Sequence, residues 1–279
     1  MKKPLIGAST ALLLAGATAL AGAAPAAAAS KAPAAVTVNF AGTVALSNCS
    51  GSVVRMPGSA AGDPALVLTN GHCLELGMPD PGEVVVNHSS NRSFTLLSAS
   101  GSGLGTLRAS KVVYSTMTDT DVTLYQLNTT YAAIKSRYGI DPLTISASHP
   151  TAGAAIKVVS GYWKKIYSCN VDGFVYRLQE GGWTFKDAVR YTSACNTIGG
   201  TSGSPVIDTA TGQVAAVNNT GNEDGERCTV NNPCEVDANG TVTVRKGINY
   251  AEETYGIPAC FAPGNKLDLT RAGCTLPRP

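Results

Sequence analysis

Short apolar runs, rich in β-branched residues, recur along the chain with small or polar turn residues between them. Runs of this kind occupy residues 36–40, 52–54, 84–86, 111–114, 122–127, 156–159, 174–178, 214–218 and 242–244. Many short strands at such spacing predict an all-β sandwich or a pair of barrels. Helical periodicity is weak, and the best candidate for a helix is 250–255, near the C-terminus.

Turn and breaker residues gather in one internal stretch, Ser136–Pro150. This stretch divides most of the chain into two segments, 36–140 and 141–259, each long enough for a small barrel. Residues 260–279 are predicted to form a C-terminal tail closed by a disulfide. The polar stretch 221–239 is predicted to be a surface loop that a second disulfide closes on itself.

The first 29 residues have the order of a secretory signal peptide. A basic start, Met1-Lys2-Lys3, precedes an apolar run from Leu5 to Leu20, and small residues follow up to Ala29. A membrane anchor is the alternative, but Gly, Ser and Thr interrupt the run and no second long apolar stretch follows. We therefore expect cleavage after Ala29 and a secreted, extracellular protein. Residues 30–35 are then a short N-terminal stub or pro-segment.

Charge excludes two classes of partner. Without its first 29 residues the chain keeps 250 of 279 residues and loses two of its 21 basic residues, so 19 basic residues face 19 acidic ones. A chain with zero net charge and no Lys/Arg cluster has no basic surface to which nucleic acid or anionic lipid would bind. We expect neither nucleic acid nor a membrane as partner, and a monomeric protein.

All eight cysteines lie beyond the predicted signal peptide. An even number in a secreted chain predicts four disulfides. Proximity in the sequence favours the pairs Cys169–Cys195, Cys228–Cys234 and Cys260–Cys274. Metal binding is the alternative, but the chain has no Cys-x-x-Cys motif and its three histidines are scattered, so no metal is predicted.

A first candidate for chemistry is the stretch Gly200-Thr201-Ser202-Gly203-Ser204-Pro205. Glycine before the serine permits a tight bend that exposes the hydroxyl, and the amides of Gly200 and Ser202 can then point at one spot, as an oxyanion requires. An ordinary Gly/Ser-rich loop is the alternative reading.

Two further candidates precede this serine in the chain. His72 follows the apolar run 66–68 and stands next to a cysteine that can restrain it. Asp121 opens the apolar run 122–127, where a carboxylate can fix the tautomer of an imidazole. A structural histidine and an ordinary turn aspartate are the alternatives. The order His, Asp, Ser differs from that of subtilisins and of α/β-hydrolases.

Five motifs together resemble those of a bacterial member of the trypsin/chymotrypsin-like serine protease family. They are Cys49–Val53, Thr69–Cys73, Asp121–Leu124, Val158–Trp163 and Gly200–Pro205. The resemblance implies two packed six-stranded antiparallel barrels with the active site between them, to which we add the short C-terminal helix. It also implies a disulfide between Cys49 and Cys73, a triad of His72, Asp121 and Ser202, and an oxyanion hole at Gly200 and Ser202.

The family layout also indicates substrate-binding residues. It puts Asn196 at the floor of the primary specificity pocket, Thr197 beside it and Asn218 on a wall strand. None of the three is charged, so we expect a preference for uncharged side chains, with large apolar or aromatic ones ahead of polar ones. Asp224 and Glu226 lie in a nearby loop, where either carboxylate can still counter a cationic side chain.

Two residues depart from the family pattern. Thr201 replaces the acid that binds a new N-terminal ammonium in trypsin, so activation by insertion of the N-terminus is not expected. Ile198 replaces the cysteine usual four residues before the serine.

The sequence therefore predicts a secreted serine endopeptidase that forms an acyl-enzyme intermediate and needs no cofactor. Its expected partners are protein or peptide substrates and, as a second candidate, a protein inhibitor. A protease-like binding module that has lost turnover is the alternative from another class, and an esterase differs only in its substrate.

Overall fold

The protein is described by a computed structural model that covers Met1 and residues 36–279. Apart from Met1, the predicted signal peptide and the stub at 30–35 lie outside the described residues. Ala34–Pro279 form one compact unit. In the described part of the chain, no helix is both long and apolar enough to cross a membrane.

The first half of this unit forms one sheet. Its strands are β1 (Thr43–Ala45), β2 (Ser50–Arg55), β3 (Pro64–Thr69), β4 (Val84–Ser89), β5 (Ser93–Leu97), β6 (Gly103–Thr116), β7 (Val122–Thr130) and β8 (Leu143–Thr144). Six of them pair in the order β1-β5-β6-β7-β3-β2, and the pairing of β1 with β2 closes an antiparallel ring. β4 pairs with β6 outside the ring, and β8 lies parallel to β2.

The second half repeats this plan. Its strands are β9 (Ala155–Ser160), β10 (Lys165–Glu180), β11 (Trp183–Tyr191), β12 (Pro205–Asp208), β13 (Val214–Gly221), β14 (Cys234–Val236), β15 (Val242–Val244) and β16 (Asn249–Glu253). Six pair in the order β10-β9-β12-β13-β16-β11, and β11 pairs with β10 to close the ring. β14 and β15 extend the sheet beyond β10, and β17 (Phe261–Ala262) pairs with β18 (Lys266–Leu267) in the tail.

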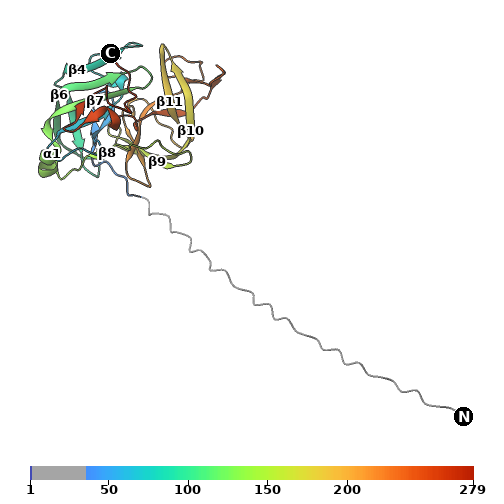
Figure 1. Cartoon of the computed structure of the whole chain (residues 1–279), viewed down its shortest axis with the longest axis horizontal. Helices are drawn as coiled ribbons and strands as arrows, with labels where there is room; N and C mark the ends of the chain where they lie inside the picture. Colours follow the sequence, from blue (N-terminus) through green and yellow to red (C-terminus); the bar gives the residue numbers. More distant parts are fainter. Residues whose placement is uncertain (2–35) are drawn as a thin grey trace. The chain divides into compact units, whose positions relative to one another are not determined.

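Two closed six-stranded antiparallel rings confirm the predicted all-β, chymotrypsin-like fold. Figure 1 labels β6 and β7 of the first ring, with β4 paired to β6 outside it, and β9, β10 and β11 of the second ring. β8 pairs with β2 of the first ring, although it lies beyond the expected boundary at residue 140. The boundary between the two segments therefore remains a prediction.

An apolar cluster shared by both rings holds them together. Leu68, Tyr114 and Leu124 of the first sheet lie in it with Ile207 and Val217 of the second. β6 shows this in its burial pattern, because Leu107–Lys111 alternate between the interior and solvent whereas Val112–Thr116 are buried on both faces. A strand that alternates has one covered face, and a strand buried throughout has two.

The predicted C-terminal helix is wrong. Asn249–Glu253 form strand β16, which lies between β11 and β13 in the second ring. The α-helix of the described chain is α1 (Tyr131–Tyr138), which follows β7 directly. Thr130 caps its start by accepting a hydrogen bond from the amide of Ala133 at 3.2 Å, and Gly139, with φ +70°, ends it. The tail contains a 3-10 turn, η2 (Pro258–Cys260).

The strand expected at 36–40 is also wrong, because the first strand begins at Thr43. The other runs that the sequence indicated all lie within strands. The four disulfides join Cys49 to Cys73, Cys169 to Cys195, Cys228 to Cys234 and Cys260 to Cys274. These are the four pairs expected from the sequence.

Candidate active site

One cleft brings the three expected catalytic residues together. His72, Asp121 and Ser202 all line it, and it contains about 630 Å³ of space that no protein atom fills, including a part open to solvent. Its other walls include Met78 and Met117 of the first half but come mostly from the second half of the chain, with Glu180, Trp183, Phe185, Thr197, Ile198, Asn219, Thr220, Gly221 and Asn249 among them.

The pairing of β3 with β7 puts His72 beside Asp121. Thr69 at the end of β3 stands opposite Thr123 of β7, so the 3-10 turn η1 (Gly71–Cys73) begins next to the start of β7. His72 Nδ1 lies 2.6 Å from Asp121 Oδ2, and the His72 amide donates to Asp121 Oδ1 at 3.0 Å. The Asp121 side chain is 1% exposed, so this carboxylate is held on both oxygens in a dry environment.

Glycine at position 71 makes this approach possible. A Cβ atom there would lie 2.2 Å from the carbonyl oxygen of Thr116 and 2.8 Å from Asp121 Oδ1. Both distances are far below van der Waals contact, so a side chain at this position would push His72 away from its partner.

Charge at the site favours the protonated imidazole. Burial by itself lowers the pKa of His72, but the negative charge of Asp121 and its hydrogen bond, helped by Glu180, raise that pKa above its ordinary value of 6.5. An imidazole with this environment is a stronger base than a free histidine, which suits a residue that must take a proton from a hydroxyl.

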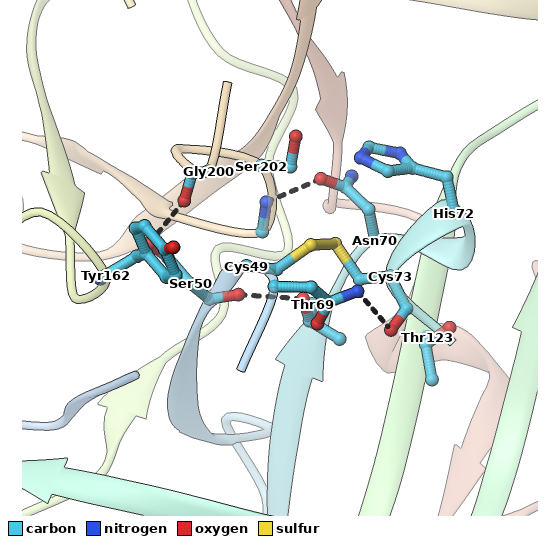
Figure 2. Close-up of a disulfide and its surroundings, with 12 residues drawn as sticks. Cys49, Ser50, Thr69, Asn70, His72, Cys73, Thr123, Tyr162, Gly200 and Ser202 are labelled. Carbon is cyan, nitrogen blue, oxygen red and sulfur yellow. Dashed lines mark hydrogen bonds between the residues drawn. A yellow bond between two sulfur atoms is a disulfide. The ribbon is translucent and has the colours of Figure 1, made fainter. Parts of the chain in front are cut away.

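Asn70 links all three segments that carry the expected triad. Its Nδ2 donates to the carbonyl oxygen of Asp121 at 2.8 Å, and its Oδ1 accepts the amide of Gly203 at 2.5 Å. Figure 2 shows this side chain close to His72 and directed at the loop of Ser202. The sequence analysis missed Asn70, although a polar residue at the end of the buried strand β3 is a signal that could have been used.

The Ser202 hydroxyl faces a different acceptor in this structure. It donates to the carbonyl oxygen of Asn219 at 3.2 Å, and within residues 36–279 no hydrogen bond joins it to His72. Catalytic hydrogen bonds are often incomplete before substrate binds. The serine is therefore in the cleft with the histidine, but its hydroxyl must turn to reach it.

The loop around Ser202 leaves two amides free. Among the described residues, the backbone nitrogens of Gly200 and Ser202 have no protein acceptor, whereas the neighbouring amide of Thr201 donates to the carbonyl of Ile198 at 3.0 Å. Gly203, with φ +79°, lets the chain turn here, and a Cβ atom at this residue would lie 2.1 Å from the carbonyl oxygen of Ser50. Free amides at such a turn form a suitable site for a negatively charged oxygen.

Residues after β9 support the same loop. Trp163 Nε1 donates to the carbonyl oxygen of Gly199 at 2.7 Å. The Tyr162 ring lies so close to Gly200 that an added Cβ atom would be 2.9 Å from it. On the other side, Ser50 Oγ donates to the carbonyl oxygen of Gly200 at 3.3 Å (Figure 2). These contacts fix the carbonyls of the loop and so orient the amide of Gly200.

The hydroxyl of Thr201 makes its hydrogen bonds within the protein. Its side chain is buried, its hydroxyl donates to the carbonyl oxygen of Ile198 at 2.5 Å, and the hydroxyl accepts Asn218 Nδ2 at 3.1 Å. Nothing at this position requires an ammonium group as partner.

Of the three expected substrate-binding residues, Thr197 alone lines the cleft. Asn196 is exposed and lies outside the cleft lining. Asn218 lies on the wall strand β13, but its side chain is buried outside the cleft lining. There its Oδ1 accepts the hydroxyl of Tyr191 at 3.1 Å and its Nδ2 donates to Thr201. Asn219 and Thr220, which follow Asn218 on β13, supply the cleft lining instead, together with Asn249, which accepts the Thr197 hydroxyl at 2.8 Å. Alternation turns Asn219 to the face opposite Asn218, and the irregular pairing of β13 with β16 between Asn218 and Gly221 interrupts the alternation at Thr220.

Two buried glutamates near the site were not anticipated either. Glu180, at the end of β10, lines the cleft and accepts the amide of Asn231 at 2.7 Å. Glu252 on β16 accepts Nδ2 of Asn219 at 2.8 Å. Burial raises the pKa of both carboxyl groups, that of Glu252 to about 8. Asn231 belongs to the stretch 221–239, so this expected surface loop also contributes to the cleft.

Comparison with known proteins agrees with the fold. The sequence model of the family described as "Trypsin-like peptidase domain" matches residues 49–217, which is more than half of the chain. Curated protein sequences give no match. The chain therefore belongs to the trypsin-like peptidase family, and it is a serine-type endopeptidase.

Solved structures of proteases are similar at low sequence identity. The MamO protease domain from Magnetospirillum magneticum is 14% identical, with 77% of this chain and 92% of that chain covered and a TM-score of 0.47. The thermostable serine protease AL20 from an extremophilic microorganism is 17% identical, with 77% and 91% covered and a TM-score of 0.43. Nocardiopsis protease is 13% identical, with 77% and 93% covered and a TM-score of 0.42.

Proposed function

We propose that the protein is a secreted endopeptidase in which Ser202 is the nucleophile, His72 the general base and Asp121 the partner of His72. One observation carries the proposal: the 2.6 Å contact between His72 and Asp121 lies in the cleft that Ser202 also lines. The predicted signal peptide and the four disulfides support secretion, because disulfides persist in oxidising compartments.

The proposed reaction begins when the Ser202 hydroxyl leaves the Asn219 carbonyl and turns to His72. Ser202 Oγ attacks the substrate carbonyl carbon while His72 Nε2 takes the hydroxyl proton. The oxygen of the substrate becomes an anion that the amides of Gly200 and Ser202 bind. His72 then protonates the departing amine, which leaves an acyl group on Ser202, and water releases that group by the same steps in reverse order.

Covalent labelling tests this assignment. A fluorophosphonate should modify the wild-type protein at Ser202, and Ser202→Ala should lose the label and about 10⁴-fold or more in peptide hydrolysis. Ser204→Ala is the matched control, because that buried serine two residues away donates to the carbonyl of Thr201 and lies outside the cleft lining.

Three outcomes speak against the proposal. A wild-type protein without label or hydrolysis would support the alternative, a protease-like binding module without turnover. Label on Ser204 would show that the serine motif is misaligned. Hydrolysis of esters but of no peptide would make the protein an esterase.

Most of the cleft lining supports a preference for uncharged substrate side chains, although the exposed Glu223 also lines the cleft and can attract a cationic one. Thr197, Asn219 and Asn249 offer neutral polar groups, whereas Trp183 and Phe185 offer aromatic surface. Glu180 is buried, and burial raises its pKa, so this carboxyl group attracts a cationic side chain less than an exposed glutamate would.

Side-by-side assays of amide substrates with Phe, Leu, Gln, Glu or Arg before the cleaved bond test this preference. Phe and Leu should be cleaved fastest. A lead of Arg or Glu by more than about tenfold, worth about 1.4 kcal/mol, would contradict it without affecting the triad.

A further inference from the structure

Three side chains outside the cleft converge on one point of the second ring. His149 lies in the connection before β9, Asp187 on β11 and Glu253 at the end of β16. His149 Nε2 is 3.1 Å from Asp187 Oδ2 and 3.0 Å from Glu253 Oε1. One ligand atom from each of the three lies within 4.8 Å of the other two.

The ring of His149 turns Nε2 toward the two carboxylates. Its Nδ1 lies 2.7 Å from the carbonyl oxygen of Pro150, which can only accept, so Nδ1 carries the proton. In the neutral imidazole Nε2 is then unprotonated. A histidine that binds a metal through one nitrogen usually donates the other N–H to a carbonyl or a carboxylate, as His149 does here.

Glu253 is the second, independent observation. Its side chain is only 5% exposed, and neither carboxylate oxygen has a hydrogen-bond partner among the described residues. A buried carboxylate normally accepts several hydrogen bonds or binds a cation, because an unsatisfied one costs several kcal/mol. Glu253 instead faces the carboxylate of Asp187 and the Nε2 of His149, so two carboxylates here need a positive charge, which either a protonated His149 or a bound cation supplies.

We propose that His149, Asp187 and Glu253 bind a zinc ion. Zinc accepts imidazole nitrogen and carboxylate oxygen at about 2.0–2.2 Å, and two ligands of a tetrahedral ion with such bonds are about 3.3 Å apart. The separations of 3.0 and 3.1 Å around Nε2 match that spacing closely. Calcium and magnesium prefer sites made of oxygen alone, and the imidazole disfavours them.

The rest of the site fits an ion that is partly open to solvent. The side chains of His149 and Asp187 are 38% and 46% exposed, so water can take the remaining coordination position. The Tyr255 hydroxyl donates to Asp187 Oδ2 at 3.4 Å and can hold this carboxylate in place. Asp187 has φ +56°, a left-handed conformation that aspartate adopts more readily than most residues.

Zinc at this point would join the segment between the two rings to two strands of the second ring. Because a ligand that binds the folded state alone stabilises it by mass action, the bound ion should raise the melting temperature. This effect does not depend on the peptidase reaction, and its test does not measure hydrolysis.

The test uses the full chain, freed of metal with a chelator and titrated with zinc chloride by calorimetry, with thermal unfolding measured in parallel. The wild-type protein should bind one zinc ion and melt at a higher temperature with zinc. His149→Gln and Glu253→Gln should each weaken binding by at least about tenfold. His88→Gln is the matched control, because His88 Nδ1 also lies near a backbone carbonyl, that of Ser89 at 2.9 Å, but it belongs to β4 in the first half of the chain and should bind no ion.

The proposal is overturned if the metal-free wild type binds no zinc, which would leave a histidinium ion paired with two carboxylates. It is overturned equally if His149→Gln, shown by its far-UV spectrum to be folded, binds zinc as the wild type does. If calcium binds more tightly than zinc and the same variants abolish calcium binding, the assignment of the metal is wrong.

Discussion

The charge on Asp121 decides at which pH His72 can act as a base. His72 is surrounded by protein, which favours its neutral form, but the carboxylate 2.6 Å away favours the protonated form and outweighs burial. Because the pKa of His72 is raised, the neutral form that can accept a proton predominates only above that pKa. The acid limb of the pH profile of kcat/KM should therefore lie above pH 6.5, the ordinary value for histidine.

Replacing Asp121 with Asn should move that limb. The amide removes the charge that raises the pKa of His72 but leaves the burial that lowers it, so the acid limb should shift to lower pH. The rate at the plateau should also fall by about 10⁴-fold, because an amide can hold the wrong imidazole tautomer. Glu180→Gln is the control, and its shift should have the same direction but be smaller. A limb that stays in place in Asp121→Asn would contradict the role of this charge.

Asn70 should matter for catalysis as well as for stability. Asn70→Ala leaves the carbonyl of Asp121 without this donor and removes one of two acceptors of the Gly203 amide, and each lost buried bond costs about 1–3 kcal/mol. We expect kcat to fall by at least about tenfold with little change in KM, measured by steady-state kinetics.

Asn265→Ala is the matched control for Asn70→Ala. Asn265 is also buried and donates to the carbonyl of Pro64 at 2.8 Å and to the Tyr131 hydroxyl at 2.9 Å, outside the cleft. Its loss should lower the melting temperature but leave kcat unchanged. Equal losses of kcat in the two variants would show that Asn70 acts through global stability alone.

The sequence indicated the reacting residues better than the residues that surround them. His72, Asp121 and Ser202 stand in motifs whose chain order is informative, and the structure places all three in one cleft. Asn196 and Asn218 were chosen by counting along the chain. Counting fails there because the alternation of side chains along β13 and the turn before Ser202 decide which of two neighbours faces the cleft.

Among the elements, the turn η1 depends on the disulfide next to His72. Cys73 ends this turn, and Cys49 precedes β2, so the bond ties the turn to the strand beside it. Arg92 adds a second restraint by donating to the carbonyl oxygen of Cys73 and to the Tyr125 hydroxyl. The orientation of the imidazole therefore rests on contacts of the turn as much as on Asp121.

Removing that disulfide should reduce activity before it unfolds the protein. The double variant Cys49→Ala/Cys73→Ala should lose about 3 kcal/mol of unfolding free energy by loop entropy and also lose kcat in the folded state. The double variant Cys260→Ala/Cys274→Ala should show a similar loss of stability, since its loop spans 14 residues against 24, but should keep kcat. Kinetics at a temperature where denaturant curves show both variants folded would separate the effects, and equal kcat values would contradict the restraint.

Strands could be predicted more reliably than the helix. β7 and β13 consist largely of β-branched and apolar residues, which suit a pleated buried surface. β16 contains Asn249, Glu252 and Glu253, residues that rarely occupy a central strand, so its position in the ring could not be inferred from composition. The helix α1 has only eight residues, too short for a clear periodic pattern, although Thr130 and Gly139 mark its ends.

At the scale of the whole molecule, the active site should not depend on the N-terminus. The buried hydroxyl of Thr201 is hydrogen-bonded to Ile198 and Asn218, and Val36, at the start of the described range 36–279, donates its amide to the carbonyl of Thr209 at 2.7 Å. Proteins that begin at Ser30, or that carry a few extra residues before it, should therefore hydrolyse peptides at equal rates. A large gain in activity on removing residues 30–35 would instead identify them as an inhibitory pro-segment.

The segment after the second ring has a consequence for biosynthesis. Phe261 and Leu276 belong to the apolar cluster that both rings share, and the Tyr114 hydroxyl donates to the carbonyl oxygen of Pro277 at 3.0 Å. These residues follow both rings in the chain, so a nascent polypeptide cannot complete the packing beneath its cleft until both rings have been translated. The order of segments along the chain thus delays maturation of the cleft until almost the whole chain has been synthesised.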